Sequence, residues 1–121
     1  MVCHVVMMKP RSDLSMSDRD VLIGAFERAI REIPSVRNVR VARRVVHGAT
    51  YEARMPDAAD YLVIIDFEDL EGLETYLRHP AHEELGARFN DSLAAALVYD
   101  FEGVALEELR RLSPSTRGPG S

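Results

Sequence analysis

Residues 60–85, DYLVIIDFEDLEGLETYLRHPAHEEL, decide the fold. The first part, DYLVIIDF, is nearly continuous apolar and β-branched sequence, which is typical of a central strand covered on both faces. Asp69 then offers a side-chain cap to a short helix that runs through Leu77. Pro80 begins a second helix, because a proline at the first helical position loses no intrahelical hydrogen bond. The stretch therefore predicts a buried strand followed by a helical segment that is split near Pro80.

The remainder of the chain predicts three further strands and one long helix. The helix opens at Ser17, has apolar residues at helical spacing and stops at Pro34, which has no amide proton to donate. The strands cover residues 2–9, 39–47 and 97–101. The order is β-α-β-β-α-β, which is the ferredoxin-like arrangement: an α+β fold with a four-stranded antiparallel sheet and helices on one face.

The second face of this sheet has no predicted element to cover it. Strands as apolar as residues 2–8 and 61–67 would leave a sizeable apolar patch in water if that face stayed bare. A second copy of the same chain is the simplest cover. We therefore expect a symmetric homodimer through the open sheet face.

Composition narrows the possible partners. The net charge is −5, from 15 Lys and Arg against 20 Asp and Glu, which argues against duplex DNA, so no nucleic-acid partner is expected. Cys3 is the only cysteine, which excludes an internal disulfide and a cysteine-built zinc site. The apolar run 2–8 is too short to span a bilayer and lacks the features of a secretory signal. We expect no membrane association and a cytoplasmic location.

The length of 121 residues suits one domain. We expect that domain over residues 1–103, followed by a short helical extension at 104–112. Residues 113–121, SPSTRGPGS, are rich in Ser, Pro and Gly and are expected to be disordered.

One histidine and one tyrosine of the helical segment form a candidate site. His82 shares a helical face with Leu85 and Phe89, so it points toward the core. It also lies in the first turn after Pro80, where the positive end of the helix dipole keeps an imidazole neutral and able to act as a base. Tyr76 lies at the edge of the preceding apolar face. The two could remove a carbon-bound proton and stabilise the resulting enolate, or they could merely be hydrogen-bonded core residues.

Other constellations point to no cofactor. His79 and His82, with Glu83 beside them, resemble a possible metal pair, but no further ligand is implied and Pro80 restricts the geometry, so no metal is expected. Asp66 and Asp100 stand between apolar residues in two strands and are expected to be hydrogen-bonded at the sheet or at an interface. A Gly-rich phosphate loop is absent from the sequence.

Five segments in this order resemble the stress-responsive α/β-barrel domain, also called the Dabb family, over residues 1–103. The segments are HVVMMK (4–9), IPSV (33–36), YLVIIDFED (61–69), LETYLRHPAHEEL (73–85) and VYDFE (98–102). The resemblance implies a dimeric α/β barrel. The family includes a branch similar to olivetolic acid cyclase, an enzyme that closes a polyketide chain by aldol condensation without a metal or an organic cofactor.

In that branch a histidine and a tyrosine of the helical segment perform the chemistry, and they match His82 and Tyr76. Its pocket histidine in the first strand matches His4. Where the branch has a pocket tyrosine in the first helix this chain has Phe26, and where it has a histidine in the third strand this chain has Leu62.

We therefore expect a pocket for a small apolar or aromatic ligand, lined by His4, Phe26 and Phe89. If the chain is an enzyme, it is a cofactor-independent cyclase or isomerase in which His82 is the general base and Tyr76 the oxyanion donor. Two alternatives remain: a non-enzymatic stress-responsive structural protein, and a haem-binding or aromatic-oxidising relative in the same superfamily.

Overall fold

A computed structural model describes residues 1–115 and confirms the α+β ferredoxin-like fold. The end of the predicted tail, residues 116–121, lies outside the described residues. The elements in chain order are β1 (Val2–Pro10), α1 (Met16–Glu32), β2 (Val36–Arg43), the 3₁₀ helix η1 (Thr50–Arg54), β3 (Tyr61–Phe67), α2 (Leu70–Arg78), α3 (Pro80–Ser92), β4 (Leu93–Glu102) and the 3₁₀ helix η2 (Leu106–Arg111).

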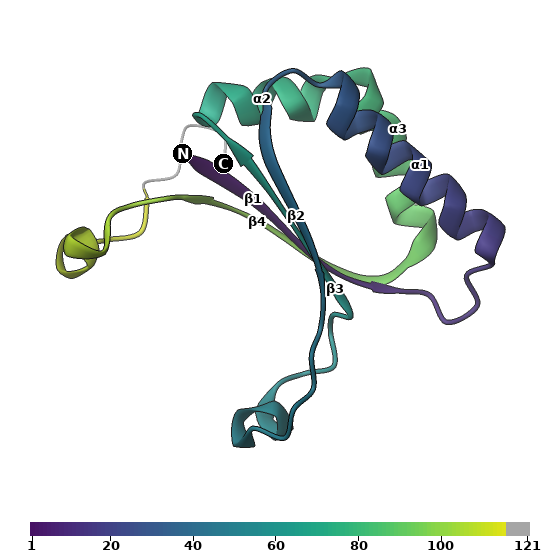
Figure 1. Ribbon diagram of the computed structural model, residues 1–121, viewed down its shortest axis with the longest axis horizontal. Helices are drawn as coiled ribbons and strands as arrows, with labels where there is room; N and C mark the ends of the chain where they lie inside the picture. The colour runs from purple at the N-terminus through teal and green to yellow at the C-terminus, as the bar shows by residue number, and fades with distance from the viewer. Residues whose placement is uncertain (116–121) are drawn as a thin grey trace.

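The four strands form one antiparallel sheet in the order β2-β3-β1-β4. The helices α1, α2 and α3 cover one face and leave the other bare (Figure 1). Side chains alternate between the two faces along each strand. Val2, His4 and Val6 of β1 face the helices and are buried. The residues between them belong to what we call the open face, whose apolar members are Cys3, Val5, Met7, Leu62, Ile64, Leu97, Tyr99 and Phe101.

Three predicted elements have wrong boundaries. Helix α1 begins at Met16 and not at Ser17, because the hydroxyl of Ser15 accepts the amide hydrogen bond of Asp18 and so caps the helix. Strand β2 covers Val36–Arg43 and not residues 39–47, since its pairing with β3 begins at Val36. Strand β4 begins at Leu93, directly after α3, four residues earlier than the predicted start at 97.

The densest part of the core lies where β3 ends and α2 begins. Ile33, Phe67 and Tyr76 are each at most 1% exposed there. Gly72 of α2 lies against the end of β3, since a Cβ at this position would be in van der Waals contact with the Cβ of Phe67 at 3.4 Å. Ala29 of α1 is completely buried between the helices and the sheet. This end of the helix layer is therefore closed by packed side chains.

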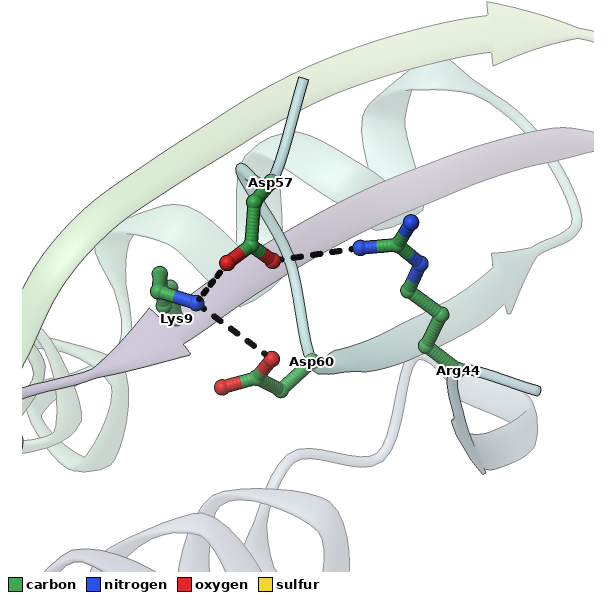
Figure 2. A network of polar contacts seen from close by, with 4 residues as sticks. All are labelled: Lys9, Arg44, Asp57 and Asp60. Atoms are coloured by element: carbon green, nitrogen blue, oxygen red, sulfur yellow. Dashed lines mark hydrogen bonds and ion pairs between the residues drawn. The ribbon is translucent and has the colours of Figure 1, made fainter. Parts of the chain in front are cut away.

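Two segments extend beyond the sheet, away from the helices: the β2–β3 connection with η1, and the chain after β4 with η2 (Figure 1). The first is held at its base by an ionic network (Figure 2). Lys9 Nζ lies 3.1 Å from Asp57 and 3.6 Å from Asp60, and Arg44 donates to the other oxygen of Asp57 at 3.1 Å. The hydrogen bond from Lys9 lowers the pKa of Asp57.

The predicted helical extension is the 3₁₀ helix η2, and its leucines Leu106, Leu109 and Leu112 are exposed. Within residues 1–115, no helix combines the length and the apolar character that a bilayer crossing requires.

Candidate functional site

A cavity of about 530 Å³ lies between the helix-facing side of the sheet and helices α1, α2 and α3. This volume lies within the usual range of ligand pockets, about 300–1,000 Å³. Most of the lining is apolar. All five residues that the sequence singled out border the cavity: His4, Phe26, Tyr76, His82 and Phe89.

Tyr76 lies at the closed end of the cavity, on α2. Its ring centroid lies 4.7 Å from that of His82, 5.2 Å from that of Phe67 and 5.8 Å from that of His4. Its hydroxyl forms no hydrogen bond within residues 1–115, yet the oxygen is not sealed from the cavity. Burial raises the pKa of Tyr76 to about 12. The phenol therefore stays protonated and has a hydrogen bond to donate.

His82 lies beside Tyr76 and belongs to α3, which begins after the break at Pro80. Burial is the first cause that lowers the pKa of His82, and the nearby His4 lowers it further. From the sequence, the helix dipole was expected to keep the ring of His82 neutral. In the structure, desolvation is the first cause that lowers its pKa. The backbone of Leu77 and the carboxylate of Glu83 act in the opposite direction and raise the pKa of His82. In the neutral ring one nitrogen carries the proton. The other nitrogen is left to accept a proton.

His4 is positioned by an acidic side chain on the neighbouring strand. His4 and Asp100 are directly opposite each other in the β1–β4 ladder, and His4 Nδ1 lies 2.7 Å from a carboxylate oxygen of Asp100. The carboxylate holds the ring with Nδ1 toward β4, which leaves Nε2 for the cavity. The sequence predicted a hydrogen bond for Asp100 without identifying its partner.

Several other candidates lie outside this group. His79 caps α3, since its Nδ1 accepts the amide hydrogen bond of Ala81, so the partial metal site of the sequence does not form with His82. Asp66 lies on the open face, where it accepts a hydrogen bond from Asn38 at 3.3 Å. It therefore does not converge with Asp100.

Leu62, which the resemblance matches to a histidine of the third strand, does not line the cavity. Leu62 pairs with Met7 in the β1–β3 ladder and belongs to the open face, whereas its neighbours Tyr61 and Val63 line the cavity. Sequence reasoning also missed two polar residues at the exposed mouth of the cavity, Arg19 and Asn90.

Together these side chains can perform acid–base chemistry without a cofactor. A neutral imidazole and a protonated phenol meet in a cavity with a mostly apolar lining, where hydrogen bonds to a developing charge are stronger than in water. The second imidazole, His4, lies beside the phenol and is oriented by Asp100.

The structure is that of a small ferredoxin-like α+β protein in which helices cover one face of the sheet. An apolar cavity lies between sheet and helices, and histidine and tyrosine side chains lie at its closed end. The chain belongs to the stress responsive A/B barrel domain family, whose model matches residues 2–103.

Three relatives illustrate the range of the fold. Olivetolic acid cyclase of Cannabis sativa is 19% identical over 100 residues, which are 83% of this chain and 94% of that protein. A dimeric ferredoxin-like protein of unknown function from Thermobifida fusca has a TM-score of 0.64 at 19% identity, with 83% of this chain and 88% of that chain covered. Hydroxynitrile lyase from Passiflora edulis has a TM-score of 0.69 at 15% identity, with 83% and 90% covered.

Proposed function

We propose that the cavity binds a small, largely apolar carbonyl compound, and that the chain is a cofactor-independent cyclase or isomerase that acts through an enolate. One observation carries this proposal: a phenol that has no hydrogen-bond partner within residues 1–115 and an imidazole whose pKa is lowered lie 4.7 Å apart, ring centre to ring centre, in one apolar cavity.

The roles follow from the protonation states. The free ring nitrogen of His82 takes a proton from the carbon next to the carbonyl, and the electron pair of that C–H bond moves toward the carbonyl oxygen. Tyr76 donates its hydrogen bond to this oxygen as it becomes negative. In an isomerisation the protonated imidazole then returns the proton to a different carbon. In a cyclisation the enolate carbon first forms a bond to a second carbonyl carbon of the same substrate, and the imidazole gives its proton to the alkoxide that results. Positioned general bases of this kind contribute roughly 10²–10⁴-fold to a rate.

The remaining lining residues would bind and orient the substrate. Phe26 and Phe89 present aromatic rings to the cavity, and His4 with Asp100 offers a hydrogen bond to a second polar atom. Olivetolic acid cyclase is a sequence relative of this chain, and a hydroxynitrile lyase has the same fold. Both similarities support an enzymatic site in this cavity.

We also propose that two copies of the chain associate through the open face. Leu97, Tyr99 and Phe101 of β4 are between 40% and 56% exposed on that face, an unusual apolar surface for a lone chain. The Thermobifida fusca relative is dimeric, which supports the same assembly here.

Tyr76→Phe separates the enzymatic proposal from a purely structural role. We expect the free energy of unfolding to change by less than about 1 kcal/mol, because the lost hydroxyl has no hydrogen-bond partner in the described part of the chain. Binding of benzylacetone, an apolar aryl ketone, should weaken at the same time. Urea denaturation and calorimetric titration measure the two effects. A loss of more than about 2 kcal/mol of stability would instead favour a structural residue.

A further inference from the structure

The mouth of the cavity has a positively charged side chain, Arg19, that takes no part in the proposed chemistry. Among the residues that line the cavity, Arg19 is the one permanent cation, and no Asp or Glu lines it. Arg19 is on α1, near its beginning, and is exposed. Within residues 1–115, no carboxylate forms an ion pair with it.

Three acids of this region lie outside the cavity. Asp13, Asp18 and Asp91 line a separate small hollow beside the mouth. Arg11 occupies that hollow, where it binds the carboxylate of Asp13 at 2.8 Å and the backbone carbonyl of Asp91 at 2.9 Å. The guanidinium of Arg19 is thus left to the larger, apolar cavity.

The mouth lies at the opposite end of the cavity from the histidines. An ion pair between Arg28 and Glu84 joins α1 to α3, and the amide of Arg11 donates to the carbonyl of Ser92 at 3.0 Å. These contacts bring the beginning of α1 to the end of α3, where Asn90 also borders the cavity. Asn90 follows His82 by eight positions in α3, which corresponds to a rise of about 12 Å along the helix axis.

We propose that the natural ligand is an apolar carboxylate, with its anionic group bound by Arg19 at the mouth and its body extending inward toward Tyr76 and His82. This inference rests on the proposed function of the cavity and specifies its substrate class. Arginine binds carboxylates through paired N–H donors, and Asn90 can add an amide donor. A carboxylate held at the mouth would place the carbonyl of a longer keto acid at the distant acid–base pair.

Octanoate and octanamide provide a direct test, because their apolar bodies are the same and only the head group differs. We expect the wild-type protein to bind octanoate at least about fivefold more tightly than octanamide in calorimetric titrations at low salt. Arg19→Gln should bring this ratio close to one. Arg31→Gln, which changes an exposed arginine on the same helix outside the cavity, should leave the ratio unchanged.

Equal binding of the two compounds by the wild type, or a preference for octanoate that survives Arg19→Gln, would overturn the inference. In that case the proposed cavity function would still stand if both compounds bind and benzylacetone competes with them. If the wild type binds neither octanoate nor octanamide nor benzylacetone, both the inference and the proposed binding function fail.

Discussion

Replacement of Gly86 by leucine is expected to abolish ligand binding while it stabilises the fold. Gly86 is on α3, one helical turn after His82, and borders the cavity. A Cβ at this position would meet no atom within 4 Å, so a larger side chain has room and would extend into the space that a ligand needs. Leucine also has a better helix propensity than glycine, by about 1 kcal/mol.

The expected result is a loss of benzylacetone affinity of about 100-fold or more in calorimetric titrations, together with a raised melting temperature. Gly24→Leu is the matched control. Gly24 is a helical glycine on α1 with the same free space around its Cβ, but it does not border the cavity. Unchanged affinity in Gly86→Leu would show that ligands bind elsewhere.

Ile64→Lys is expected to convert the proposed dimer into a monomer. Ile64 is on the central strand β3, opposite Val5 of β1, in the middle of the open face. On this face the partner of Ile64 on its other side is Arg40 of β2, and the acid two positions along β3, Asp66, already accepts a hydrogen bond from Asn38. An interface there would therefore bury the new ammonium group beside an existing cation, at a cost of several kcal/mol. Light scattering after size-exclusion chromatography measures the mass directly, and circular dichroism verifies that the variant remains folded.

Leu70→Lys serves as the control for surface charge, because Leu70 begins α2 and is 59% exposed on the helix side. This variant should keep the mass of the wild type. A monomeric wild type, or an Ile64→Lys variant that remains dimeric, would contradict an interface on the open face.

Much of the fold could be predicted from residues 60–85, because the apolar strand and the two helices are each specified by local signals. Asp69 caps α2 and Pro80 begins α3, as predicted. Helix and strand ends were less certain, since neighbouring serines compete to cap a helix: Ser15 does so, and Ser17 lies within the first turn.

The candidate site was predictable only where its residues are close in sequence. Tyr76 and His82 lie on either side of one proline, so their meeting follows from local geometry. The pairing of His4 with Asp100 depends on the register of two strands that are 96 positions apart in the sequence at this pair. Arg19 is an ordinary surface arginine by pattern, and its relation to the cavity comes from the packing of α1 on α3.

We expect His82 to move a proton to or from carbon while Tyr76 donates a hydrogen bond to the developing oxyanion. The most direct measurement of this proton transfer is the incorporation of deuterium next to the carbonyl of benzylacetone in D₂O, followed by proton NMR. We expect the wild-type protein to accelerate this exchange and both His82→Gln and Tyr76→Phe to lower the protein-catalysed rate by about 100-fold or more.

The pH profile should identify the base. Because burial lowers the pKa of His82, the ring loses its proton below its ordinary pKa of about 6.5. The exchange rate should therefore rise with pH through this depressed pKa and become constant above it. Exchange no faster than in buffer, or an accelerated rate that His82→Gln leaves unchanged, would contradict the account.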